Sequence, residues 1–146
     1  METIENLIVK KTVEINAPPT KVWEALTNSS YTKIYMFALD VESDWKPGSR
    51  VVWTGDTGGI KTYRKGKVLK TEPDRLLKFS EFNPSAGAKD VDENYAHITY
   101  ELKADARTTV LSVITDHLNG DEARRKDSEG FWDRVPPALK MLLETK

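Results

Sequence analysis

The chain has 146 residues, of which 38% are hydrophobic and 31% are charged, and its formal net charge is -1 at pH 7. This size and composition are typical of one folded domain and exclude a disordered or collagen-like chain. The balanced charge excludes a global field that would recruit nucleic acid or an anionic membrane. Because the chain has no cysteine, disulfides, thiolate catalysis and sulfur-ligated zinc are excluded as well.

The N-terminal segment is the first place to look for a targeting signal. Charged residues interrupt Ile4, Leu7 and Ile8, so the segment lacks the continuous apolar run of a signal peptide. No later stretch reaches the length of a membrane span. We therefore expect a cytoplasmic protein that neither enters nor crosses a membrane.

The first third of the sequence predicts a strand followed by two helices. Between residues 4 and 15, β-branched residues are mixed with charges and partly alternate with them, as in a half-buried strand. The proline pair at 18–19 ends this strand, and the fixed φ of proline suits the first turn of a helix that we place at 19–27. A second, shorter helix is indicated by the apolar spacing over residues 31–37.

From residue 40 to about residue 118, the pattern predicts short strands separated by turns. The segments are rich in β-branched and aromatic residues, and glycine, proline and aspartate stand between them. We predict six strands, at 40–43, 50–54, 60–71, 75–82, 95–103 and 107–115. We interpret Gly55, Gly58 and Gly59 as a hairpin turn, because no Gly-Lys-Ser/Thr sequence and no helix follow them, as a phosphate-binding loop would require.

The C-terminal segment, after Asn119 and Gly120, predicts a long amphipathic helix. Apolar residues recur at spacings of three and four and form a stripe wide enough to face a core. This stripe consists of Phe131, Trp132, Val135, Leu139, Leu142 and Leu143. Pro136 and Pro137 lie inside it, so we expect Val135 to leave the helical conformation and the helix to kink or restart there. The basic residues at 124–126 are interpreted as solvated first turns of the helix rather than as a nucleic-acid site.

Four motifs in a fixed order resemble one family. They are INAPPTKVWEALT at 15–27, DWKPGSR at 44–50, GKVL at 66–69 and EPDRL at 72–76. Together they are similar to the START-like (SRPBCC) superfamily and, within it, to the activator of heat-shock-protein ATPase homologue family. The prolines in the terminal helix depart from the family pattern.

The resemblance implies an α+β helix-grip fold as one START-like domain over residues 1–146. In this fold a seven-stranded curved antiparallel sheet wraps around the long C-terminal helix, in the order strand, two helices, six strands, helix. Relatives share a cavity between sheet and helix, and they include lipid and hormone carriers, cyclases and co-chaperones. Fold alone does not choose among these functions.

Aromatic residues are the strongest indication of a binding site. Aromatic walls suit flat apolar ligands, and a tyrosine hydroxyl can hold a polar group of the ligand. We predict that the ligand-binding residues are Tyr35, Trp53, Tyr63, Phe79, Glu81, Tyr100, Ser112, Phe131, Trp132 and Val135. The alternative is that these rings fill the core and leave no cavity.

Two pairs of ionisable residues are candidates for chemistry. His97 and His117 are the only histidines. A metal site would need at least one carboxylate converging with them, and we expect one of the two histidines to be exposed near a turn, so we predict no metal. Glu81 and Asp116 would both face the pocket if Leu77 and Phe79 in one strand, and Val110, Ser112 and Ile114 in the other, point inward. A buried carboxylate of this kind could act as an acid or base.

Three functions remain open at this level. We expect first a non-catalytic domain, without a cofactor, that binds a small hydrophobic molecule and uses the kink at Pro136 as a gate. The second is a co-chaperone that stimulates a heat-shock-protein ATPase, which rests on the resemblance. The third is a cofactor-free cyclase or hydrolase using Glu81 or Asp116. We expect a monomer or a homodimer.

Overall fold

The structure is a computed structural model that describes residues 8–36, 39–57, 59–84, 87, 89–116 and 122–144. The predictions that concern Ile4, Phe37, Gly58, His117 and Asn119–Gly120 lie outside the described residues. Among the described residues, no helix combines the length and the apolar character needed to cross a membrane.

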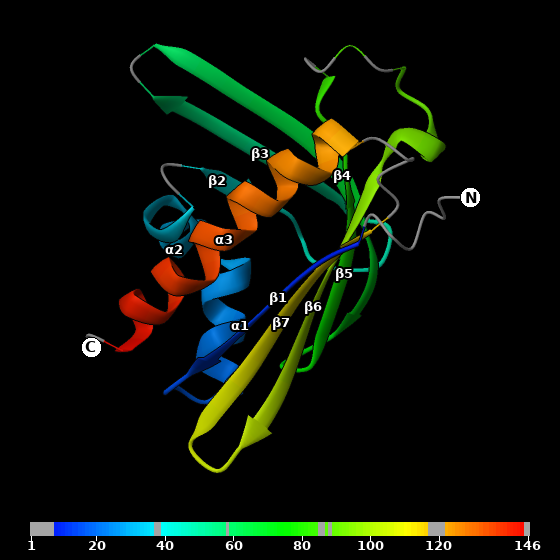
Figure 1. Ribbon diagram of the computed structural model, residues 1–146. Coiled ribbons are helices and arrows are strands. Elements are labelled where there is room, and N and C mark those ends of the chain that lie inside the picture. The colour runs from blue at the N-terminus through cyan, green and yellow to red at the C-terminus, as the bar shows by residue number, and fades with distance from the viewer. Residues whose placement is uncertain are drawn as a thin grey trace.

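A seven-stranded antiparallel sheet forms the body of the molecule (Figure 1). The strands are β1 (Val9–Ile15), β2 (Asp40–Glu42), β3 (Arg50–Thr57), β4 (Ile60–Glu72), β5 (Leu76–Glu81), β6 (Ala96–Asp105) and β7 (Thr108–Asp116). Their order across the sheet is β1-β7-β6-β5-β4-β3-β2, so the first strand closes one edge beside the last. This is the predicted helix-grip topology, and all seven strands overlap predicted strand segments. The prediction that Gly55 lies in the hairpin turn is wrong, because it pairs with Thr62 inside β3.

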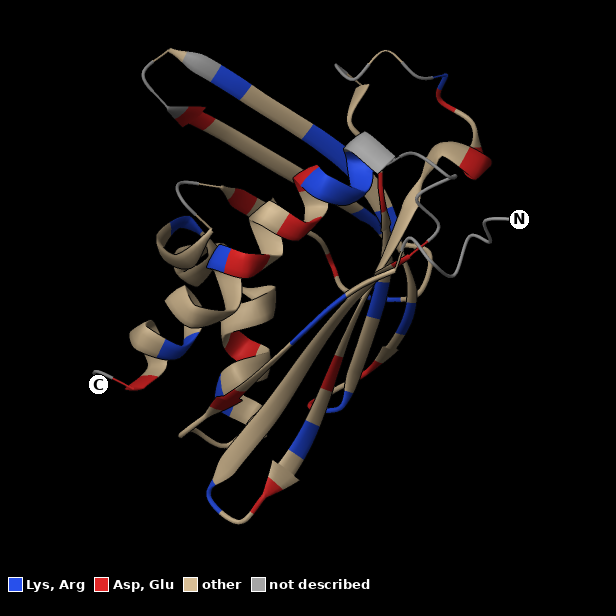
Figure 2. Cartoon of the chain, in the orientation of Figure 1, with Lys and Arg blue, Asp and Glu red and all other residues tan. Residues whose placement is uncertain are grey.

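Three α-helices lie on one side of this curved sheet (Figure 1), and basic and acidic residues are spread over both the sheet and the helices (Figure 2). They are α1 (Pro19–Thr27), α2 (Ser29–Tyr35) and α3 (Glu122–Glu144), and a short 3-10 turn, η3 (Asp92–Asn94), precedes β6. Pro19 opens α1, where a missing N–H costs nothing. The side chain of Asn28 caps α2 by accepting a hydrogen bond from the Ser30 N–H at 2.9 Å.

The two faces of the sheet are distinguished by the alternation of buried and less buried residues in β6 and β7. In β6, Ile98, Tyr100 and Leu102 are buried, whereas the residues between them are half-buried. We call the face that carries these three residues the inner face, because it packs toward the helices, and the opposite one the outer face. In β7 the inner residues are Leu111 and Val113, which stand opposite Leu102 and Tyr100.

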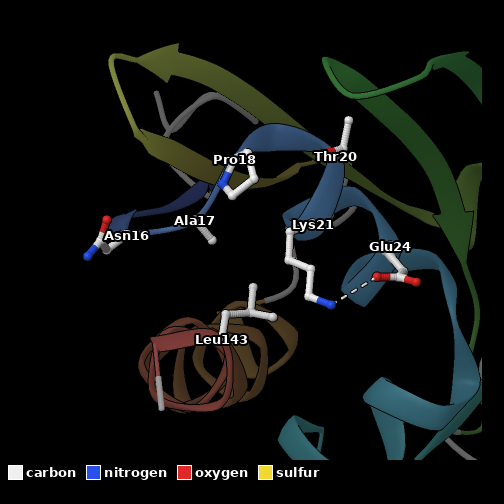
Figure 3. Close-up of a pocket in the computed structure, with 7 residues that line it drawn as sticks. All are labelled: Asn16, Ala17, Pro18, Thr20, Lys21, Glu24 and Leu143. Atoms are coloured by element: carbon white, nitrogen blue, oxygen red, sulfur yellow. Dashed lines mark hydrogen bonds and ion pairs between the residues drawn. The ribbon is translucent and has the colours of Figure 1, made fainter. Parts of the chain in front are cut away.

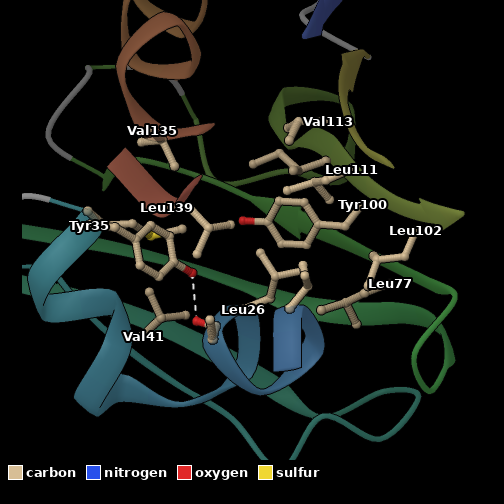
Figure 4. Close-up of a cluster of buried hydrophobic side chains, with 14 of the residues drawn as sticks. Leu26, Tyr35, Val41, Leu77, Tyr100, Leu102, Leu111, Val113, Val135 and Leu139 are labelled. Atoms are coloured by element: carbon tan, nitrogen blue, oxygen red, sulfur yellow. Dashed lines mark hydrogen bonds between the residues drawn. The ribbon is translucent and has the colours of Figure 1, made fainter. Parts of the chain in front are cut away.

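The core lies between the inner face and the helices (Figure 4). From α3 it receives Trp132, Val135, Leu139 and Leu143, which recur at spacings of three and four and are all buried. This stripe matches the predicted one, except that Phe131 and Leu142 are only partly buried at its border.

Helix α3 continues through Pro136 and Pro137, and Val135 keeps its helical conformation. The prediction that Val135 leaves the helix and that the helix restarts is therefore wrong. Pro136 turns into the core and Pro137 faces solvent, so tertiary packing on one side outweighs the lost backbone hydrogen bonds.

Candidate functional site

The inner face carries a chain of aromatic rings that runs from the sheet to α3. Phe79 of β5 lies at its centre, with ring centroids 5.4 Å from Trp53 and 5.4 Å from Tyr100. Tyr100 in turn meets Trp132 edge-on at 5.9 Å, and Trp132 meets Phe131 at 4.9 Å. Edge-to-face contacts at these distances are favourable, so the rings support one another as a packed cluster.

Tyr100 is the unusual member of this cluster. Its side chain is 2% exposed, and its hydroxyl makes no hydrogen bond to any residue in the described part of the chain. Figure 4 shows the hydroxyl oxygen pointing toward Leu139 of α3. Burial raises the pKa of Tyr100, and the negative charge of Glu81 raises it further. The hydroxyl therefore stays neutral and can donate a hydrogen bond. A tyrosine hydroxyl that makes no hydrogen bond to the described residues is free to donate one to a ligand or to water.

Tyr35 is a useful contrast to Tyr100. It is equally buried, but its hydroxyl donates to the carbonyl oxygen of Ala25 at 2.8 Å (Figure 4). Burial also raises the pKa of Tyr35. Its hydrogen bond ties α2 to α1, so this ring is satisfied as a structural element.

A polar pair lies on the inner face beside the aromatic cluster. Arg64 of β4 stands opposite Trp53, and its Nη1 is 3.0 Å from a carboxylate oxygen of Glu81. The Glu81 side chain is 18% exposed, so the pair is partly shielded from water. The Nε of Arg64 is buried and has no hydrogen-bond partner in the described residues. A second unpaired donor therefore faces the same side of the sheet as Tyr100.

Most residues of the predicted site share the inner side of the molecule. Those that are buried there or line its edge are Tyr35, Trp53, Phe79, Glu81, Tyr100, Phe131, Trp132 and Val135. The expectation that Glu81 follows Leu77 and Phe79 onto the inner face is confirmed by its partner Arg64. Whether these residues bind a ligand stays a prediction.

Tyr63, Ser112 and Asp116 are on the wrong face for that site. Tyr63 stands opposite the exposed Thr54, and its hydroxyl accepts a hydrogen bond from Arg50 at 2.8 Å on the outer face. In β7 every second residue points inward, including Leu111 and Val113. Ser112 and Asp116 therefore point outward. The predicted alternation of β7 is one residue out of step, which exchanges the two faces.

Two residues near the cluster were not predicted. Arg64 was missed, although the pairing of Thr57 with Ile60 places it opposite Trp53 by counting along the two strands. Trp45, which appeared only within a motif, takes a left-handed backbone conformation with φ of 58°. Its indole N–H donates to the Thr27 carbonyl at 2.8 Å, and its ring meets Phe79 at 6.4 Å. A non-glycine residue at such a φ is a strained position that tertiary contacts hold.

A separate open groove lies at the far end of the helices (Figure 3). It has a volume of about 650 Å³ and is bounded by the start of α1 and by Leu143 of α3. Lys21 and Glu24 pair across its wall at 3.3 Å. None of the predicted ligand-binding residues lines this groove.

The fold and the inner-face cluster define a protein of the START-like, helix-grip class. The chain belongs to the family of Activator of Hsp90 ATPase homolog 1-like proteins, which it matches over residues 16–144. No curated protein matches the chain.

Solved structures agree with this assignment. The protein ChR145 from Cytophaga hutchinsonii is 38% identical, with a TM-score of 0.78 and a match that covers 94% of each chain. The Aha1 dimer from Colwellia psychrerythraea is 19% identical, with a TM-score of 0.73, and the match covers 94% of this chain and 96% of that one. CalU16 from Micromonospora echinospora is 18% identical, with a TM-score of 0.73, and 92% of this chain matches 73% of it. The last two show the fold alone.

Proposed function

We propose that the chain is a non-catalytic binding domain for a small, flat, apolar molecule that carries one hydrogen-bond acceptor. The observation behind this proposal is Tyr100, a residue of the apolar core whose hydroxyl makes no hydrogen bond to the described residues. A ligand acceptor would complete its hydrogen bonding, and the rings of Phe79 and Trp132 would contact the flat part of the ligand.

The packing of the cluster sets a condition on binding. Because the Tyr100 ring contacts Trp132 and its hydroxyl points toward Leu139, a ligand reaches the hydroxyl only when α3 moves away from the sheet. Binding would therefore be slower than diffusion and would depend on how firmly α3 is held.

The test uses two probes that differ in one acceptor. 2-Acetylnaphthalene has a carbonyl oxygen, whereas 2-ethylnaphthalene has the same shape without it, and quenching of tryptophan fluorescence reports binding of either. Y100F removes only the hydroxyl. We expect it to weaken binding of 2-acetylnaphthalene by about 3- to 10-fold, the worth of one hydrogen bond, and to leave 2-ethylnaphthalene unchanged.

Tyr35 supplies the matched control. Y35F removes a hydroxyl that is already bonded to Ala25, so it lowers stability without changing the preference between the two probes. If wild type binds neither probe, or if Y100F and Y35F change the preference equally, the Tyr100 hydroxyl is not the anchor and this proposal is wrong.

The family name favours a second candidate, stimulation of an Hsp90 ATPase through the protein surface. An ATPase assay with the Hsp90 of the same organism tests it, and the absence of stimulation at saturating concentration excludes it. The mass of the protein in solution, measured on the same samples, distinguishes a monomer from a homodimer. Since Glu81 and Asp116 lie on opposite faces of the sheet, we propose no acid–base role for them as a pair.

A further inference from the structure

A hollow on the outer face of the sheet is separate from the inner-face cluster. It has a volume of about 500 Å³, which is within the range of pockets that hold small organic ligands. It is lined by Arg50, Lys65, Gly66, Lys67, Leu69, Ser80, Asp92, Tyr95 and His97. Four elements, β3 to β6, contribute to it together with η3, so residues far apart in sequence meet there.

Two cations of this hollow lie on neighbouring strands, and their positive charges have no acidic partner among the described residues. Arg50 and Lys67 are direct cross-strand partners in the β3–β4 register. Among the described residues, no carboxylate lies within 4.0 Å of either cation, and the bond that Arg50 makes goes to the neutral hydroxyl of Tyr63. Like charges placed directly opposite on neighbouring strands are destabilising. By contrast, the third cation, Lys65, is paired with Asp90.

The base of the hollow is held rigidly. Gly66 lies so close to β5 that a Cβ atom there would be 1.7 Å from the Ser80 carbonyl oxygen. The buried Ser80 hydroxyl accepts a hydrogen bond from the Lys67 N–H at 3.1 Å, which fixes the backbone that carries the Lys67 ammonium. Tyr95 is stacked on Phe82 at 4.9 Å, and its hydroxyl donates to Asp90 at 2.6 Å. The backbone under Lys67 and the Tyr95 ring are therefore ordered before any ligand arrives.

We propose that this hollow binds a small organic anion. Its carboxylate or phosphate group would pair with Arg50 and Lys67, and its apolar part would lie on Leu69 and Tyr95. An anion between the two cations removes their repulsion and adds charge-assisted hydrogen bonds, which are stronger than neutral ones. Asp90 and Asp92 at the border disfavour a long polyanion such as nucleic acid and favour a ligand of limited size and charge.

The experiment titrates the ¹⁵N-labelled protein with inorganic phosphate, phenyl phosphate and benzoate, and follows the amide signals by NMR. We expect the Gly66, Lys67 and Ser80 amides to shift most. Phenyl phosphate should bind at least 5-fold more tightly than inorganic phosphate because only it uses the apolar wall. Comparison with benzoate shows whether a phosphate or a carboxylate is preferred.

The matched variants are R50Q, K67Q and K103Q, each of which removes one positive charge from the outer face. Lys103 is exposed on β6 and does not line the hollow. We expect R50Q and K67Q each to weaken phenyl phosphate binding at least 5-fold, and K103Q to leave it within 2-fold of wild type. Equal weakening by all three variants would mean unspecific attraction and would overturn the proposal, as would shifts confined to the inner face.

Discussion

Lys11 of β1 and Asp133 of α3 form an ion pair across the edge of the sheet, with Nζ 2.6 Å from Oδ1, and Glu129 lies 3.6 Å from the same ammonium. Lys11 belongs to the inner face of β1, where an apolar residue would be expected beside Val113. The hydrogen bond to Asp133, with the charge of Glu129 added, raises the pKa of Lys11. The edge strand thus holds the first half of α3 partly by charge.

We expect K11M to loosen the first half of α3. The melting temperature should fall slightly at low salt, and the difference from wild type should nearly vanish in 1 M NaCl, because salt screens partly exposed ion pairs. K10M, on the outward residue next to it, is the control. A melting difference that persists unchanged in 1 M NaCl would show that Lys11 acts through packing instead.

Gly66 should tolerate no side chain. Because a Cβ there would overlap the Ser80 carbonyl oxygen, we expect G66A to reduce the unfolding free energy by about 3 kcal/mol or more. G130A tests the same substitution within α3, where nothing lies within 4 Å of the added atom. That variant should gain about 0.5–1 kcal/mol from helix propensity. Urea denaturation measures both, and equal effects would contradict the close approach of β4 and β5.

Two buried threonines of β7 should respond in opposite directions to the same substitution. The Thr109 hydroxyl donates to the Ala17 carbonyl at 2.7 Å, whereas the Thr115 hydroxyl has no partner in the described residues. We expect T109V to lose about 1–2 kcal/mol and T115V to be neutral or to gain up to about 1 kcal/mol. Thermal unfolding followed by circular dichroism gives both values. A loss in T115V as large as in T109V would reveal a partner of the Thr115 hydroxyl.

Glu144 should contribute to stability above acidic pH only. A hydrogen bond from Lys140 lowers the pKa of Glu144 from its ordinary value of 4.5. A second hydrogen bond, from the Asn16 N–H, lowers this pKa further. Its contribution is therefore complete above about pH 4.5 and is lost as the pH falls through the lower pKa of the folded state. We expect E144Q to be less stable than wild type at pH 7, with the difference shrinking below pH 4.5. A constant difference from pH 7 to pH 3 would rule out this linkage.

The element order and the topology were predictable, because proline and glycine mark nearly every boundary. The helix at 19–27 and the strand at 60–71 agree with α1 and β4 to within one residue. The β3 strand is longer than predicted, since Gly55 pairs as a strand residue instead of opening the turn. Glycine in a sequence does not reveal whether a strand continues through it.

The faces of β7 could not be read from the sequence. Val110 and Ile114 outside are as β-branched as Val113 inside, so either alternation satisfies the pattern. Only the pairing of Tyr100 with Val113 decides it, and that contact depends on the register of two strands. The outer hollow was missed for a similar reason, because Arg50 and Lys67 are adjacent in space through strand pairing alone.

Pro136 and Pro137 divide α3 into two halves, although the helix continues through them. Pro136 and Pro137 have no N–H, so the carbonyls of Trp132 and Asp133 lose their usual donors four residues along. The turn that joins the two halves is thus the least protected place in the helix, and amide hydrogen exchange should begin there. Residues 138–144, held by Leu139 and Leu143, should exchange last, so that α3 opens as two cooperative units rather than one.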